Sequence, residues 1–299
     1  MTRAGAQRTR PCGADSSDGQ ERVGGVRTGE TRAGSKSTPN AKPNSESELE
    51  SHRTPTATVS LDLHVHTAES YDCDTPLVDV LERAADAGLD GICVTDHDAI
   101  EQSLAAATIA PEYGLFAIPG VEVSTRDGHV LALGVETRPE PGRPFSETVT
   151  EIRSQGAIAI VPHPFRRSRH GVPADVIEDC DGIEVHNAMC VTGVRNRQAA
   201  RFAENRGFAG VAGSDAHTAR LVGRAVTDVH LESAAVPDGD PTAIDRGRIL
   251  EAIADGRTTV RGGLASPTSC VRKYAQNVSV KFRTGVRTGI GRLRTGNVE

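Results

Sequence analysis

The chain has 299 residues, of which 37% are hydrophobic and 25% charged, and its formal net charge is −6. It contains no stretch near the ~18 consecutive apolar residues of a membrane span and no secretory signal, so we expect a soluble cytoplasmic protein with no membrane partner. The six cysteines form no Cys-x-x-Cys pair, which argues against a zinc ribbon or a dithiol redox motif.

Composition and charge divide the chain into three parts. Residues 1–57 are rich in Ser, Thr, Gly, Arg and Pro, which predicts a disordered extension because so little apolar area can be buried. Residues 58–270 carry 18 basic and 32 acidic residues and form the expected folded domain. Residues 271–299 carry seven basic residues and one acidic residue, so we expect a flexible basic tail that is either solvated or in contact with nucleic acid.

Strand and helix signals alternate throughout the folded part. The predicted elements, in chain order, are a strand over 59–64, a helix over 76–87, a strand over 91–95, a helix over 100–110, strands over 115–124 and 129–135, a helix over 145–154, strands over 157–162 and 182–186, a helix over 195–205, strands over 207–213 and 225–231, and a helix over 248–255. Thr75 and Pro76 are predicted to cap and begin the first helix, and Gly88 to end it. The strands 115–124 and 129–135 are expected to pair as a hairpin.

This alternation, with continuous apolar strands, predicts a parallel sheet covered by helices. Six or seven strand-helix units in about 210 residues fit a closed or nearly closed barrel, in which functional groups lie at the carboxyl ends of the strands. An open, doubly wound sheet is the alternative that the sequence leaves open. No Gly-x-Gly-x-x-Gly follows a strand, so nothing supports dinucleotide binding.

Five of the ten histidines stand in clusters where a short apolar run ends. Two of them, His64 and His66, point to the same side because side chains alternate along a strand. The clusters at strand ends are His64-Val65-His66, Thr95-Asp96-His97, His163-Pro164 and Ser214-Asp215-Ala216-His217. We infer one polynuclear metal site at these ends rather than scattered surface histidines.

The motifs also occur in a fixed order. They are Leu61-Asp62-Leu63-His64-Val65-His66-Thr67, Asp72, Thr95-Asp96-His97, Pro119-Gly120-Val121-Glu122, His163-Pro164 and Gly213-Ser214-Asp215-Ala216-His217. This ordered set resembles the PHP (polymerase and histidinol phosphatase) metallophosphoesterases. The resemblance implies an α/β fold, a distorted (β/α)7 TIM-like barrel, with a metal cleft at the carboxyl ends of its strands that hydrolyses phosphate esters.

The resemblance further implies a ligand set for two or three divalent metal ions. A first ion would be held by His64, His66, Glu122 and Asp215, a second by Glu122, His129 and His163, and a third by Asp72, His97 and His217. Glu122 would bridge the first two ions, and Glu122, Asp215 and His217 are the expected catalytic residues. Many family members carry a histidine where Asp72 stands, so the third ion is expected to bind more weakly or to prefer oxygen ligands.

Residue chemistry agrees with this assignment. Mixed imidazole and carboxylate ligands suit Zn²⁺, Mn²⁺ or Fe²⁺. A bridging carboxylate holds two cations ~3.5–4 Å apart, and their charge would convert a shared water into the hydroxide nucleophile. Arg166 and Arg167 are predicted to bind a phosphate group of the substrate through bidentate hydrogen bonds. The alternative is that they belong to a solvated loop with no ligand. His186 is expected to contact substrate or to support the site.

We therefore expect a phosphoesterase that acts on a small phosphorylated molecule or a nucleotide. A nuclease acting on nucleic-acid ends and a non-catalytic metal-binding regulator are the alternatives. Binuclear amidohydrolases that bridge their metals with a carboxylated lysine are excluded, because no lysine lies between Lys42 and Lys273.

Overall fold

The computed structural model describes residues 56–166, 170–235 and 240–269, and the structural statements below concern these ranges. The predicted N-terminal extension and basic tail therefore fall outside it, except that Thr56 and Ala57 already belong to the first strand. Within the described ranges, no helix is long and apolar enough to cross a membrane.

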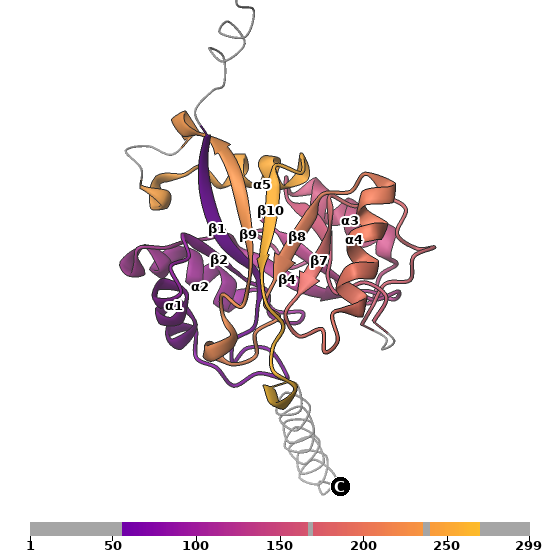
Figure 1. Cartoon of the computed structure of the whole chain (residues 1–299), viewed down its shortest axis with the longest axis horizontal. Helices are drawn as coiled ribbons and strands as arrows, with labels where there is room; N and C mark the ends of the chain where they lie inside the picture. The colour runs from indigo at the N-terminus through magenta and orange to yellow at the C-terminus, as the bar shows by residue number, and fades with distance from the viewer. Residues whose placement is uncertain (1–55, 167–169, 236–239, 270–299) are drawn as a thin grey trace, which may run out of the picture. The chain divides into compact units, whose positions relative to one another are not determined.

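In the part of the chain that the structure describes, ten strands form two five-stranded sheets (Figure 1). The first sheet has the order β10-β9-β1-β2-β3 and consists of β1 (Thr56–Val65), β2 (Gly91–Val94), β3 (Phe116–Ala117), β9 (Ala225–Glu232) and β10 (Thr258–Gly262). The second has the order β4-β5-β6-β7-β8 and consists of β4 (Gly120–Ser124), β5 (His129–Leu133), β6 (Ile158–Val161), β7 (Gly182–Asn187) and β8 (Gly210–Gly213).

Helices cover the outer sides of both sheets. They are α1 (Leu77–Asp86), α2 (Glu101–Ile109), α3 (Phe145–Ser154), α4 (Val194–Arg206) and α5 (Arg246–Ala254), with 3-10 turns at Ala110–Tyr113, Ala219–Leu221, Ser233–Ala235 and Pro241–Ala243. In Figure 1, α1 and α2 lie beside β2, whereas α3 and α4 lie on the other side, near β7. Apolar residues recur at helical spacing on α1, where Leu77, Val80, Leu81 and Ala84 are buried.

The predicted parallel (β/α)7 barrel is wrong in its closure and in part of its strand directions. The two sheets are mixed and are not closed into one barrel: β9 runs antiparallel to β1 and β10, and β5 runs antiparallel to β4 and β6. Periodicity could not reveal this, because a strand buried on both faces is apolar whichever direction its neighbour runs. The predicted hairpin is present as β4 and β5.

Pro119 explains why one predicted strand is divided between the sheets. The range 115–124 was expected to be continuous, but β3 pairs with β2 in the first sheet and β4 pairs with β5 in the second. A proline has no N–H to donate to a ladder, so pairing stops there. Two isolated bridges, Val65–Ala216 and His97–Glu122, still connect segments that belong to the two sheets.

The first helix begins one residue later than predicted. Pro76 takes the cap position, and no side chain caps the helix. Thr75 instead donates its hydroxyl to the carbonyl oxygen of His217 at 3.3 Å. The segment before α1 is thereby tied to the end of the chain's eighth strand, where a histidine cluster lies.

β1 connects the apolar core to these clusters. Its Leu61 and Leu63 are fully buried in a core that includes Ile118, Leu133 and Ile160. The alternating side chains of the same strand are polar: Asp62 accepts hydrogen bonds from the N–H groups of Ser214 and Gly223, and His64 follows it. The strand thus presents apolar side chains on one face and polar side chains on the other.

Candidate metal centre

The strand ends bring all nine predicted ligands together in the protein interior. None is more than 9% exposed. Their donor atoms fall into four overlapping groups, within each of which the atoms lie within 4.8 Å of one another: His66, Asp72, His97 and His217; His64, Glu122 and His163; His64, His66 and Asp215; and His97, Glu122 and His129. The overlap describes one extended centre rather than separate sites.

Glu122, on β4, lies close to five of the imidazoles in this centre. Its Oε1 lies 2.6 Å from Nδ1 of His129 and 3.0 Å from Nε2 of His163. Its Oε2 lies 3.2 Å from Nε2 of both His64 and His66. Each carboxylate oxygen therefore faces a different set of imidazoles, which is the arrangement that a bridging carboxylate requires.

A second cluster surrounds Asp72. Its Oδ2 lies 3.1 Å from Nε2 of His217 and 3.6 Å from Nε2 of His97. His66 completes this group, although the resemblance assigns it to another ion. Which ligand serves which ion stays a prediction, whereas the proximity of the nine residues is a property of the fold.

Hydrogen bonds outside the cluster set the orientation of its imidazoles. Nδ1 of His64 donates to Oε1 of Glu184 at 3.0 Å, and Nδ1 of His217 donates to the carbonyl oxygen of Asp215 at 2.9 Å. With Nδ1 protonated, the lone pair on Nε2 faces the centre, as metal coordination demands. His66 is held similarly by a 3.0 Å contact between its Nδ1 and the hydroxyl of Ser70.

Glu184 is a supporting residue that the sequence analysis missed. Besides the imidazole of His64, it accepts the backbone N–H of His163 at 2.6 Å and the side-chain amide of Asn187 at 2.9 Å. Only 1% of it is exposed. The available signal was a carboxylate inside an otherwise apolar strand, because such a group must find buried partners.

His186 is expected to contact substrate or to support the site, and the structure does not place it among the clustered donors. In a regular strand it would share the face of Glu184, two residues earlier. An irregularity in the pairing of β7 with β8 lies between these two residues, and Asn187 instead points inward, 3.4 Å from Oδ2 of Asp215. His186 is in none of the donor groups and does not line the adjoining cavity.

Arg166 lies at the edge of the centre, with Nη1 3.5 Å from Oδ2 of Asp215. The loop that carries it is strained, since His163 and Phe165 have φ values of 29° and 63°. Phe165 anchors the loop by packing on Phe202 of α4, with ring centroids 5.2 Å apart. Arg167, the other predicted phosphate ligand, lies outside the described residues.

Burial controls the protonation of the imidazoles. It lowers the pKa of His66 to about 3 and also lowers the pKa of His163, so both rings are neutral at pH 7 and can donate a lone pair. Burial opposes ionisation of Glu122 as well, but the surrounding imidazoles, His97 first, hold the pKa of its carboxyl well below the usual range. His64 differs from these two rings: burial opposes its charge, but the carboxylates of Glu122, Glu184 and Asp215 raise its pKa well above the usual range. The centre therefore holds both neutral imidazoles and an imidazole that the surrounding carboxylates favour in its charged form when no cation is bound.

The donor set fits divalent cations. It consists of imidazole nitrogens and carboxylate oxygens, without a thiolate. Nδ1 of His163 is buried and has no hydrogen-bond partner among the described residues, as expected of an incomplete donor set. Cys73 is close by, but its thiol donates to the carbonyl oxygens of His66 and His217, and burial raises its pKa to about 11.

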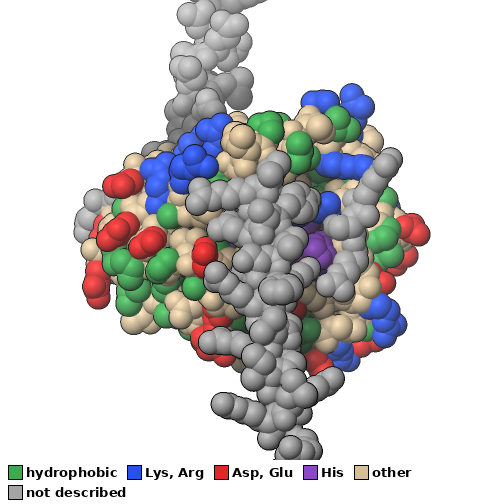
Figure 2. Space-filling model, turned by 90° about the horizontal axis from the view of Figure 1, so that it is seen from below, with side chains coloured by type: hydrophobic (Ala, Val, Ile, Leu, Met, Phe, Trp, Pro, Cys, Tyr) green, Lys and Arg blue, Asp and Glu red, His purple; other side chains and the backbone are tan. Residues whose placement is uncertain are grey.

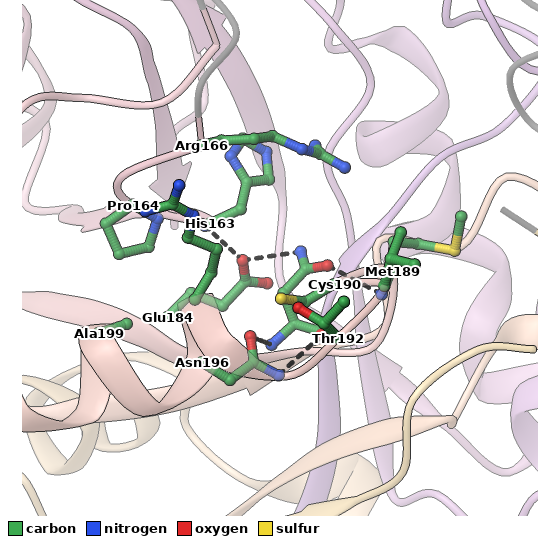
Figure 3. Close-up of a pocket in the computed structure, with 12 residues that line it drawn as sticks. His163, Pro164, Arg166, Glu184, Met189, Cys190, Thr192, Asn196 and Ala199 are labelled. Carbon is green, nitrogen blue, oxygen red and sulfur yellow. Dashed lines mark hydrogen bonds between the residues drawn. The ribbon is translucent and has the colours of Figure 1, made fainter. Parts of the chain in front are cut away.

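A cavity of about 210 Å³ adjoins the centre (Figure 3). His163, Glu184 and Arg166 all line the cavity, and His163 is also one of the nine clustered residues. Seen from below, Figure 2 shows an imidazole at the surface next to a basic side chain, on the side toward which β1 runs. The geometry thus brings together a cluster of potential metal ligands, an arginine and a small cavity.

Two parts of the chain match known families. Residues 62–178 match the PHP domain, and residues 193–258 match a segment described as PHP-associated. Seven of the nine clustered residues fall in the first match, and Asp215 and His217 fall in the second. Both matched segments therefore contribute residues to the centre.

Individual relatives cover parts of the chain. An uncharacterized protein of Methanocaldococcus jannaschii is 28% identical over 146 residues, which are 45% of this chain and 85% of that protein. The phosphoribosyl 1,2-cyclic phosphate 1,2-diphosphodiesterase of Eggerthella lenta is 38% identical over 81 residues, which are 25% of this chain and 30% of that enzyme. The match thus spans less than a third of the enzyme's length.

A solved structure has a similar fold. It is a two-domain protein from Bacteroides vulgatus, described as containing a predicted PHP-like metal-dependent phosphoesterase. The similarity has a TM-score of 0.55 at 18% identity and covers 74% of this chain and 70% of that one. At this identity the likeness concerns the fold alone.

Proposed function

Because this chain belongs to the PHP domain family, we propose that it is a metal-dependent phosphoesterase that hydrolyses a phosphate ester of a small molecule or nucleotide. The observation that carries the proposal is the position of Glu122, whose two oxygens face different imidazoles within 2.6–3.3 Å. A family match alone would leave open whether the ligand set is intact. The close approach of all nine donors supports an intact set.

The proposed cofactors are two or three divalent ions, Mn²⁺, Zn²⁺ or Fe²⁺. Held by these residues, such ions would supply Lewis acidity, lower the pKa of water and neutralise phosphate charge. The chain's own contribution is to fix the donors, with Glu184 and Ser70 orienting His64 and His66. Glu122, Asp215 and His217 are the proposed catalytic residues among them.

Arg166 is proposed to bind the phosphate group of the substrate. Its guanidinium lies beside Asp215 and lines the cavity, so it can approach an anion held against the centre. A guanidinium donates two parallel hydrogen bonds to a phosphate, which fixes the orientation of the ester. The same role for Arg167 rests on its place in the sequence.

The substrate class is a proposal supported by the relatives. The Eggerthella lenta enzyme is named for hydrolysing a cyclic phosphate diester, and its match with this chain supports phosphate-ester chemistry. A small phosphorylated molecule or nucleotide is the proposed partner. Contact with nucleic acid through the basic tail also remains a proposal, drawn from the charge of residues 271–299.

Phosphate release from an aryl phosphate tests the proposal. The full chain is loaded in turn with Mn²⁺, Zn²⁺ and Fe²⁺, and turnover is expected with at least one of them. Asp215→Asn should lower turnover by more than roughly a hundredfold, since even outer partners of metal ligands contribute 10–100-fold. Asp79→Asn, an exposed carboxylate on α1, is the matched control. Tight metal binding without turnover on any phosphate ester would contradict the proposal and favour a regulator.

A further inference from the structure

The cavity beside the centre has three walls. The loop 163–166 forms one, the segment 188–192 after β7 forms the second, and the first turns of α4 form the third (Figure 3). The loop and α4 are held together by the packing of Phe165 on Phe202. These contacts make the cavity a feature of the fold rather than a gap between independent loops.

The two asparagine side chains that line the cavity are already hydrogen-bonded within the protein. The side-chain carbonyl of Asn196 accepts the N–H of Asn187 at 3.3 Å, and its amide donates to the carbonyl oxygen of Asn187 at 3.0 Å. The side chain of Asn187 in turn accepts the N–H of Met189 and donates to Glu184. These amides are therefore occupied within the protein.

What the cavity presents to a ligand is largely apolar. Pro164, Met189, Val191 and Ala199 line it, while its positive charge is at Arg166, toward the centre, and at Arg195 on α4. A sugar or other polyol that entered would lose hydrogen bonds to water without finding equivalent partners. An apolar or aromatic group would gain from the same surface.

The dimensions of the cavity limit the size of this group. Asn196 and Ala199, which are 9% and 1% exposed, form part of its wall on α4. Its volume of about 210 Å³ exceeds that of an engineered apolar cavity of ~150 Å³ that binds benzene. A single ring therefore fits this volume.

We propose that this cavity receives the alcohol part of the substrate, and that the substrate is a phosphate ester of a compact aromatic or apolar alcohol. The inference rests on the phosphoesterase function proposed above. In the reaction, the oxygen of water bonds to phosphorus, the ester P–O bond breaks, and the two protons of water end on the alcohol and the phosphate. Arg166 holds the phosphate at the mouth of the cavity, and the segment 188–199 selects the alcohol.

Binding of two non-hydrolysable phosphonates to the Mn²⁺-loaded full chain tests the cavity without requiring turnover. Phenylphosphonate should bind at least roughly tenfold more tightly than methylphosphonate by titration calorimetry, because the phenyl ring is buried. Thr192→Phe should abolish this preference by filling the cavity from its exposed wall. Val194→Phe is the matched control, because Val194 is 51% exposed on the same segment and does not line the cavity.

The outcomes separate the two proposals. Equal binding of the phosphonates, no binding of either, or a preference that survives Thr192→Phe would overturn the assignment of the cavity. Faster turnover of a 5′-phosphorylated oligonucleotide or of a sugar phosphate than of phenyl phosphate would overturn the substrate class. A clear phenyl preference in a protein that hydrolyses no phosphate ester would uphold the cavity and reject the phosphoesterase function.

Discussion

The apolar core and the metal centre are neighbouring regions of one interior, and β1 contributes to both. In the core, Leu61 and Leu63 are buried by packing against other apolar side chains. In the centre, His64 and His66 are equally buried, but their neighbours are carboxylates and other imidazoles. The difference shows that burial stabilises the first region directly, whereas the second depends on how its charges are balanced.

The centre contains several buried acidic side chains. Four carboxylates, from Asp72, Glu122, Glu184 and Asp215, are each no more than 5% exposed. Buried charge is costly unless it is paired or coordinates a cation. We infer that bound cations stabilise this end of the molecule, so substitutions in the two regions should have separable effects on stability and on metal binding.

The largest effect is expected from Glu122→Gln. The amide keeps the shape of the side chain but cannot supply two anionic oxygens, so turnover should fall by more than roughly a hundredfold. Glu140→Gln, at an exposed site, is the control and should match the wild type. Steady-state kinetics with saturating Mn²⁺ provide the measurement. Near-normal turnover in Glu122→Gln would contradict a centre whose function depends on this carboxylate.

Leu63→Ala tests the core side of the comparison. Deleting this fully buried side chain should lower the free energy of unfolding by about 2–5 kcal/mol, through lost apolar burial and the cavity that remains. Denaturant unfolding measures the change, with Val78→Ala, 44% exposed on α1, as the control. The folded variant should bind as many metal ions per chain as the wild type; a lower number would mean that core and centre are coupled.

Glu184→Gln should weaken metal binding by about 10–100-fold while leaving the ligands themselves in place. One carboxylate oxygen of Glu184 accepts from the ring of His64, and the other accepts from the N–H of His163 and the amide of Asn187. A glutamine side chain has a single oxygen and cannot accept all three hydrogen bonds. Competition with a metal-sensitive dye measures the affinity. Glu204→Gln, exposed on α4, should behave like the wild type, and equal affinities for both variants would show that Glu184 plays no part in orienting His64.

The smallest effect concerns pH. Burial lowers the pKa of His170, whose ring stacks on His129 with centroids 4.5 Å apart, to about 4. Between about pH 6.5 and 4 the unfolded chain therefore takes up a proton at His170 that the folded chain does not. The unfolding free energy of the metal-free protein should fall as the pH is lowered through this range. The fall should be shallower in His170→Gln, and parallel curves for the two proteins would contradict this account.

Much of the local structure could be predicted from the sequence. Helix α3 has the predicted bounds, and the strand-end histidines lie together as expected, because apolar runs that end in polar residues specify both burial and the edge of a sheet. Strand direction and barrel closure could not be predicted, since buried strands have the same pattern in parallel and antiparallel pairs. The strand β10, short and mostly exposed, gave no periodic signal.

Within the centre, the errors concern the side chains that support the ligands. His186 is expected to contact substrate or to support the site because it stands at the end of a strand, yet next to the irregularity in β7 it is Asn187 that points inward. Such irregularities depend on pairing with the next strand and are invisible in one sequence. Glu184 could have been found from its position in an apolar strand, but its partners come from three segments that only the fold brings together.

The number of metal ions bound per chain tests the central claim most directly. Purified full-length protein is equilibrated with Mn²⁺, freed of unbound ion and measured by mass spectrometry of its metal content, alongside Glu122→Gln. The account predicts about two or three ions per wild-type chain and a loss of at least one in the variant. Fewer than one ion per wild-type chain, or the same number in both proteins, would contradict a centre organised around Glu122.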